Sequence, residues 1–130
     1  MPHITLEYSA NLEEHIDIAA LCGVLRDSAV ATGIFPPAGI RVRAFAATHV
    51  VIADGDPRHG FIDIAVRIGA GRDGATQSRA ADEIFDAAQR FTAEHMAVAP
   101  FLLSFELREA ATETSRKSSS IRRFLPTDMH

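Results

Sequence analysis

The order strand, helix, strand occurs twice along this chain of 130 residues, and this repetition limits the possible folds. Apolar residues alternate from residue 3 to residue 8 and again from 61 to 68, which is typical of strands. Helical spacing begins near residue 17 and again near residue 75. The starts at 3 and 61, and those at 17 and 75, are each 58 residues apart. We therefore expect two β-α-β units in tandem.

Capping and turn residues support these boundaries. Asp17 is a suitable N-cap for the first helix, and Gly33 can provide the left-handed end before Pro36. The segment ADGDPRHG, residues 53–60, is rich in turn formers and divides the chain into halves of about 2–55 and 56–110. The remaining expected elements are a strand at 40–48, a helix at 75–96 and a strand at 101–108.

The repeated unit predicts an α+β fold. Right-handed crossovers would place both helices on one face of a four-stranded mixed sheet. The other face is too mixed for a dry core and too apolar for open water. Its expected residues are Arg41, Arg43, Phe45, Asp63, Arg67, Leu102, Ser104 and Glu106. Because a symmetric assembly would cover this face, we predict a homo-oligomer.

The last twenty residues, 111–130, differ in composition from the domain at 1–110. They are Ser-rich and carry four cations and two carboxylates, whereas the rest of the chain has nine cations and fifteen carboxylates. Such a tail is often disordered. Ile121, Phe124 and Leu125 nevertheless have helical spacing. The alternative is a short amphipathic segment that docks on a neighbouring acidic subunit.

The overall charge argues against two classes of partner. The formal net charge is -4, whereas nucleic acids and anionic membranes favour a basic surface. No apolar run approaches the roughly 20 residues that span a bilayer, and the first residues lack the order of a signal peptide. We expect a cytoplasmic protein with neither nucleic acid nor a membrane as partner. Arginine supplies 12 of the 13 cations, which suits carboxylate recognition.

A glycine motif precedes the second helix. Gly69, Gly71 and Gly74 match G-x-G-x-x-G, the dinucleotide-binding pattern. The expected ribose-binding acid would be Glu94, which falls inside the predicted helix, and four strands cannot form the doubly wound sheet. We therefore expect no dinucleotide. The glycines instead predict an anion site at the helix N-terminus, beside Arg72.

The histidines and serines do not form a recognisable catalytic or metal-binding pattern. Six histidines show no paired spacing on one element, and the single cysteine adds no ligand set. The G-x-S-x-G motif of serine hydrolases is missing. We predict neither a metal site nor a cofactor.

Pro2 is a candidate catalytic residue. Initiator methionine is commonly removed before a small second residue, and Pro2 would then carry a free secondary amine. Burial and nearby arginines disfavour the protonated form of an amine, so such a group can serve as a general acid/base near neutral pH.

The predicted topology brings arginines to the same edge as Pro2. Parallel strands begin at one edge, so Arg41 lies near Pro2, and an antiparallel third strand would return Arg72 to that edge. Alternatively, Arg41 and Arg43 pair with Glu7 or Glu106 on a solvated sheet face. In that case Arg72 is a surface charge beside Asp73. For Arg43 the structural role is favoured.

Several segments together resemble the 5-carboxymethyl-2-hydroxymuconate delta-isomerase family of the tautomerase superfamily. The resemblance runs in register from Pro2 to about Glu109 and leaves out the tail. The segments are PHITLEYSANL (2–12), ATGIFPPAGIRVRA (31–44), ADG (53–55), IGAGR (68–72) and LSFELRE (103–109).

The resemblance implies a homotrimer with active sites near subunit contacts, Pro2 as catalytic base and Arg41 and Arg72 as substrate-binding residues. It implies a cofactor-independent enol-keto isomerisation of 5-carboxymethyl-2-hydroxymuconate, a dienol with three carboxylates from homoprotocatechuate catabolism. Alternatives are another proline-based reaction, such as arylpyruvate tautomerisation or hydration of an unsaturated acid. A non-catalytic trimeric module that binds an acidic metabolite is a further alternative.

Overall fold

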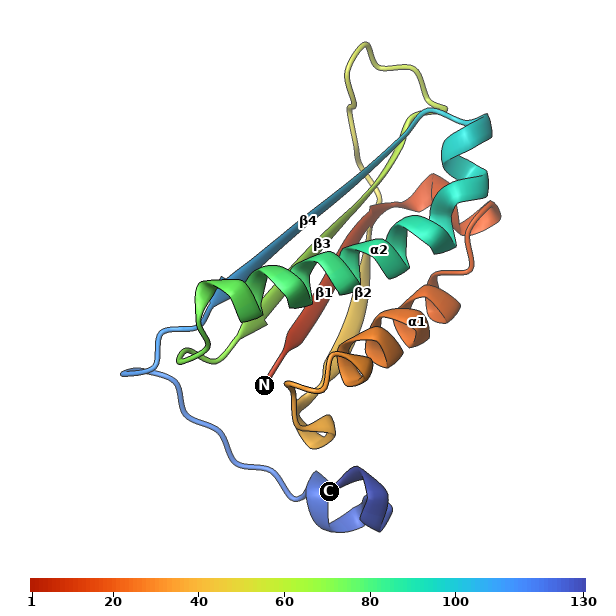
Figure 1. Cartoon of the computed structure of the whole chain (residues 1–130). Helices are drawn as coiled ribbons and strands as arrows, with labels where there is room; N and C mark the ends of the chain where they lie inside the picture. The colour runs from red at the N-terminus through yellow and green to blue at the C-terminus, as the bar shows by residue number, and fades with distance from the viewer.

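Two β-α-β units follow one another in the computed structural model, which describes residues 1–130 (Figure 1). The strands are His3–Ser9 (β1), Arg41–Ala47 (β2), Gly60–Ile68 (β3) and Phe101–Glu109 (β4). The helices are Ile18–Ala31 (α1) and Gly74–Val98 (α2), with short 3-10 turns at Ala10–Glu14, Pro37–Gly39, Ile121–Phe124 and Thr127–Met129. The tandem arrangement predicted from the repeat is confirmed.

The four strands form one mixed sheet in the order β2-β1-β3-β4. β1 is parallel to β2, and β3 is parallel to β4, while the central pair β1 and β3 is antiparallel. Both helices cross the same face of the sheet, as Figure 1 shows. The predicted α+β class and sheet type are therefore correct. Register pairs His3 with both Arg41 and Arg67, so all three lie at one edge.

The core lies between the sheet and the two helices. Alternate residues of β1 and β3 point into it and are fully buried, because these strands occupy the centre of the sheet. They include Ile4, Leu6, Ile62, Ile64, Val66 and Ile68, and they pack with Leu21, Leu25, Ile84 and Ala88 of the helices. Asp17 caps α1 by accepting from the Ala20 amide at 2.9 Å, as predicted.

The opposite sheet face is uncovered in the single chain. Phe45 is 54% exposed and Leu102 is 58% exposed, and charged residues such as Arg43 and Asp63 are exposed on the same face. Large apolar side chains at such exposure are typical of a surface that meets another protein.

The tail leaves β4 and passes beneath the N-terminal edge of the sheet (Figure 1). The Ala110 amide donates to the Ile68 carbonyl at 2.7 Å and holds the start of this segment. Farther on, Ile121 and Phe124 remain 48% and 73% exposed. Neither α1 nor α2 has the length and apolarity that a membrane-crossing helix needs.

Candidate active site

Pro2 lies at the head of β1 and is fully buried. Its carbonyl accepts a hydrogen bond from the Arg41 amide at 3.2 Å, which joins the first residues of β1 and β2. The neighbourhood of Pro2 and Arg41 expected from parallel pairing is thus present in the structure.

The terminal amine of Met1 occupies a cationic environment. Burial lowers the pKa of this amine first, and the charges of Arg72, Lys117 and Arg41 lower it further, in that order. The Met1 side chain lies on Gly39, where an added Cβ would come within 2.6 Å of the Met1 Cε. Lys117 reaches the sulfur of Met1 from the tail. The start of the chain therefore lies between cations from three separate segments.

Arg72 is held by the backbone around it. Its guanidinium donates to the Gly69 carbonyl at 3.2 Å and to the Ile34 carbonyl at 2.9 Å. The Phe35 ring supports it, with 5.0 Å from the guanidinium carbon to the ring centroid. Gly71 adopts a φ of 112°, a conformation that favours glycine, in the turn that presents Arg72. The glycine motif thus shapes the turn around an anchored arginine.

The N-terminus of α2, where the sequence predicts an anion site, has a side-chain cap of its own. The carboxylate of Asp73 accepts from the Thr76 amide at 2.7 Å and caps the helix itself. The Thr76 amide therefore already has an internal anionic partner. The sequence analysis considered Asp73 only as a neighbour of Arg72, whereas in the structure it is the N-cap of α2.

The side chains of Arg41 and Arg67 both approach the His3 ring at the same edge. Arg41 contacts its ring, with 3.3 Å from the guanidinium to Nδ1, and Arg67 approaches Nδ1 at 3.4 Å. Partial burial and the charges of Arg41, Arg67 and Arg43 lower the pKa of His3 to about 4. His3 is therefore neutral at pH 7 and can accept a hydrogen bond from either arginine.

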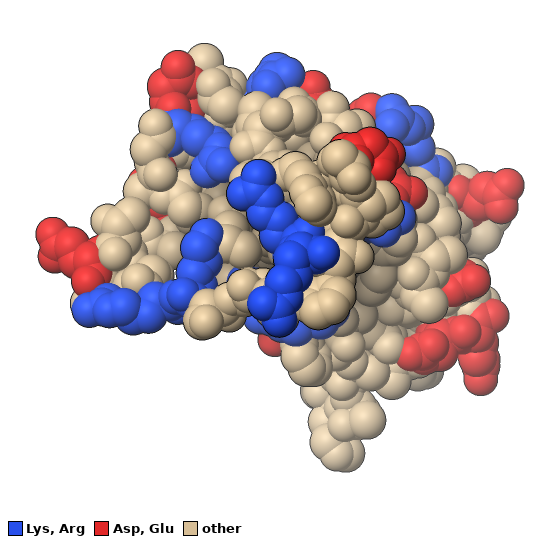
Figure 2. Space-filling view, turned by 90° about the horizontal axis from the view of Figure 1, so that it is seen from below, with Lys and Arg blue, Asp and Glu red and all other residues tan.

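A pocket of about 540 Å³ opens beside Met1. Its walls carry four cations and no carboxylate. The lining residues are Met1, His3, Arg41, Arg67, Gly69, Ala110, Thr112, Ser115, Arg116, Lys117 and Ser118. Figure 2 looks onto this end of the molecule, where blue side chains gather across the middle and red ones lie toward the margins. The pocket is suited to an anionic ligand.

None of the three arginines considered from the sequence forms an ion pair. Arg41, Arg43 and Arg72 have no carboxylate at salt-bridge distance, so the alternative pairing of Arg41 and Arg43 with Glu7 or Glu106 does not occur. Arg43 instead lines a depression of about 250 Å³ on the open sheet face. Arg72 does not line the larger pocket, and Gly69 connects it to that pocket by accepting its hydrogen bond.

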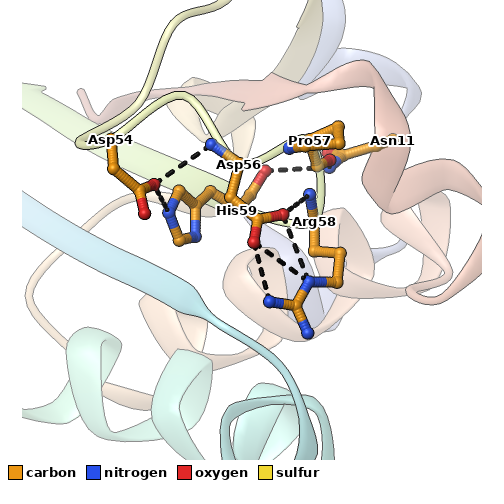
Figure 3. A network of polar contacts seen from close by, with 6 residues as sticks. All are labelled: Asn11, Asp54, Asp56, Pro57, Arg58 and His59. Carbon is orange, nitrogen blue, oxygen red and sulfur yellow. Dashed lines mark hydrogen bonds and ion pairs between the residues drawn. The ribbon is translucent and has the colours of Figure 1, made fainter.

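A second polar cluster lies at the opposite end of the sheet, in the loop between β2 and β3 (Figure 3). Asp54 binds His59 at 2.6 Å, and Asp56 binds Arg58 at 2.7 Å. Asn11 donates to the His59 carbonyl at 2.8 Å and ties the loop to the body. The carboxylates of Asp54 and Asp56 thus have their partners within the same loop. The cluster is remote from the N-terminus. Across the chain, no three His, Cys, Asp or Glu side chains are placed to hold a metal ion.

Comparison with known proteins identifies the family of this chain. Residues 2–125 match the family described as 5-carboxymethyl-2-hydroxymuconate isomerase. The chain belongs to this family. A 5-carboxymethyl-2-hydroxymuconate Delta-isomerase from Escherichia coli is 31% identical over 121 residues, which cover 93% of this chain and 96% of that protein. The family resemblance noted from the sequence is confirmed, and the match extends into the tail.

Solved structures agree with this membership. A 5-carboxymethyl-2-hydroxymuconate isomerase from Deinococcus radiodurans R1 superposes with a TM-score of 0.88 at 32% identity, covering 96% of this chain and 95% of that one. A more distant structure, described as a fused 4-OT wild type symmetric trimer, has a TM-score of 0.65 at 14% identity and covers 89% and 93%. This second likeness concerns the fold alone.

In this member of the isomerase family, the sequence interpretation missed the contribution of the tail. Arg116 and Lys117 line the pocket, and the charge of Lys117 lowers the pKa of the Met1 amine. Composition singled out Lys117 as the only lysine, in a basic segment with several hydroxyl residues. Periodicity could not place it, because an irregular segment has no pattern that fixes its path.

Proposed function

We propose that this chain is a cofactor-independent isomerase of 5-carboxymethyl-2-hydroxymuconate or a similar polycarboxylate dienol, with Pro2 as its general acid/base. The observation that carries the proposal is the partly buried terminal amine of Met1, directly before Pro2, whose pKa is lowered by burial and by the charges of Arg72, Lys117 and Arg41. Family membership supports the same substrate. The protein would act in the cytoplasm, on a small molecule rather than on a nucleic acid or membrane.

The proposed reaction moves one proton and two double bonds. The neutral nitrogen of Pro2 takes the proton from the 2-hydroxyl group, so that C2 becomes a carbonyl and the C2=C3 bond moves to C3=C4. The electrons of the former C4=C5 bond collect at C5, which receives the proton back from Pro2. Arg72 and Arg41 bind carboxylates and stabilise the dienolate charge between these steps.

Removal of Met1 is part of this proposal. A retained methionine makes the Pro2 nitrogen a tertiary amide, which has no basicity. The Met1 side chain packs against Gly39, and its amine lies near Arg72, Lys117 and Arg41. Trimming would leave the nitrogen of Pro2 as the free amine at the head of β1.

We further propose that the active form is a homotrimer in which the tail, residues 111–130, docks on a neighbouring subunit through its amphipathic segment around Ile121, Phe124 and Leu125. The uncovered sheet face and the exposed Phe124 support this assembly. The tail carries a net positive charge and the body a net negative charge, so the two attract. Sedimentation should give about three times the chain mass of 14.1 kDa.

Phe124→Ser tests the docking of the tail. Losing a buried aromatic side chain costs about 2 kcal/mol, so we expect the trimer dissociation midpoint to rise at least tenfold in concentration. A monomeric parent protein would contradict the assembly. Unchanged dissociation in Phe124→Ser would contradict the docking.

The proposed function itself is tested by the ultraviolet absorbance of 5-carboxymethyl-2-hydroxymuconate. The protein beginning at Pro2 should convert it to the 2-oxo-3-ene isomer far faster than it tautomerises an arylpyruvate or hydrates an unsaturated acid. Preference for either of the other reactions would replace the proposed substrate. A chain without turnover of any of them would indicate a binding module.

A further inference from the structure

The tail forms one wall of the N-terminal pocket. After β4 ends at Glu109, the Ala110 amide binds the Ile68 carbonyl and directs the chain across the edge of the sheet. The pocket of about 540 Å³ is lined on this side by Ala110, Thr112, Ser115, Arg116, Lys117 and Ser118. More than half of its lining residues therefore come from the segment that follows the sheet.

The tail wall of the pocket and the sheet edge opposite it are both positively charged. Arg116 and Lys117 face the same space as Arg41 and Arg67, and none of the four forms an ion pair. The domain as a whole has a negative net charge, so this positively charged cluster is opposite in sign to the rest of the domain. Four like charges around one pocket repel each other and are stabilised by an anion of several charges.

Lys117 is the tail cation that faces the reacting end of the pocket. Its ammonium group contacts the side chain of Met1, and among the nearby charges only that of Arg72 lowers the pKa of the Met1 amine more. Removal of Met1 would leave Lys117 facing the space beside Pro2. Arg116 is directed differently, because its guanidinium donates to the Glu113 carbonyl within the tail at 3.1 Å. Lys117 is also exposed, so it has room to move toward a ligand.

We infer that Lys117 binds the carboxymethyl carboxylate of the substrate and thereby selects tricarboxylates over dicarboxylates. This inference rests on the proposed function, in which Arg72 and Arg41 bind the two carboxylates of the muconate chain. A third carboxylate then needs a third cation, and an ammonium group offers a compact charge with three donors. The tail would thus determine specificity, whereas the sheet edge carries the base.

The test is Lys117→Gln, assayed on 5-carboxymethyl-2-hydroxymuconate and on 2-hydroxymuconate, which lacks the third carboxylate. Losing a charge-assisted hydrogen bond should lower kcat/KM for the tricarboxylate about tenfold or more and for the dicarboxylate less than about threefold. Lys117→Arg keeps the charge and should retain most of the preference. Arg90→Gln, which removes an exposed charge from α2, is the matched control and should leave both values unchanged.

Equal losses on both substrates, or no loss on either, would overturn the inference. Calorimetry with propane-1,2,3-tricarboxylate and glutarate separates this outcome from failure of the proposed function. An inactive parent protein that prefers the tricarboxylate, with the preference abolished by Lys117→Gln, would refute the proposed reaction but support Lys117. A parent protein with no such preference, or one unaffected by Lys117→Gln, would refute Lys117 whatever the activity.

Discussion

Replacing Pro2 with alanine is expected to lower kcat for the dienol by about 10²-fold, the lower end of the range for general acid/base catalysis. Alanine leaves a free primary amine in the same place, so part of the catalysis should persist. It lacks the ring that restricts rotation about the N–Cα bond, so the nitrogen lone pair would no longer be held in one direction. Initial rates at saturating substrate give kcat directly.

The matched control is Pro57→Ala, an exposed proline in the loop at the other end of the sheet, which should retain the parent kcat. Intact mass must show that both variants begin at residue 2. A Pro2→Ala protein with the kcat of the parent would contradict the role of this residue.

The pKa of the catalytic amine determines how activity depends on pH. Burial and the charges of Arg72, Lys117 and Arg41 lower the pKa of the Met1 amine, and we expect the same surroundings to lower the pKa of the Pro2 amine after trimming. A general base acts in its neutral form, so activity should be lost as the pH falls through this lowered pKa.

Arg72→Ala is expected to have an effect at least as large, lowering kcat by about 10²-fold to 10³-fold. The guanidinium is anchored by the carbonyls of Gly69 and Ile34, so it is already oriented before the dienolate forms. A charge that needs no reorganisation stabilises the intermediate more than it stabilises the bound substrate. Steady-state kinetics should show a loss in kcat rather than only a rise in KM.

Two further variants serve as controls for Arg72→Ala. Arg90→Ala removes an exposed arginine of α2 that pairs with Asp86, and it should keep the parent kcat. Arg72→Lys retains the charge without the planar fork and should lie between the parent and Arg72→Ala. Thermal unfolding checks that Arg72→Ala is still folded. If Arg72→Ala is folded and changes only KM, Arg72 binds the ground state and does not stabilise the dienolate.

The regular part of the fold could be predicted from local patterns. Alternation in β1 and β3 and helical spacing in α1 follow from burial on one side, and the 58-residue repeat sets the topology. Parallel pairing then placed Pro2 beside Arg41 without further information. These features depend on periodicity and register, which are encoded locally.

The rest of the site depends on contacts between distant segments. The anchoring of Arg72 by Ile34 and Phe35 joins two turns, and no spacing in the sequence indicates it. The position of Lys117 depends on the path of an irregular tail. The position of Asp73 as an N-cap was visible in the sequence, but it was interpreted as a neighbour of Arg72.

The central claim is that the free nitrogen of Pro2 performs the proton transfer. Its most direct test compares two preparations of the same chain, one beginning at Pro2 and one retaining Met1, each verified by intact mass. The account predicts that the chain with Met1 has a kcat lower by about 10²-fold or more, and that mixtures have activity in proportion to the trimmed fraction. Equal kcat in the two preparations would contradict it.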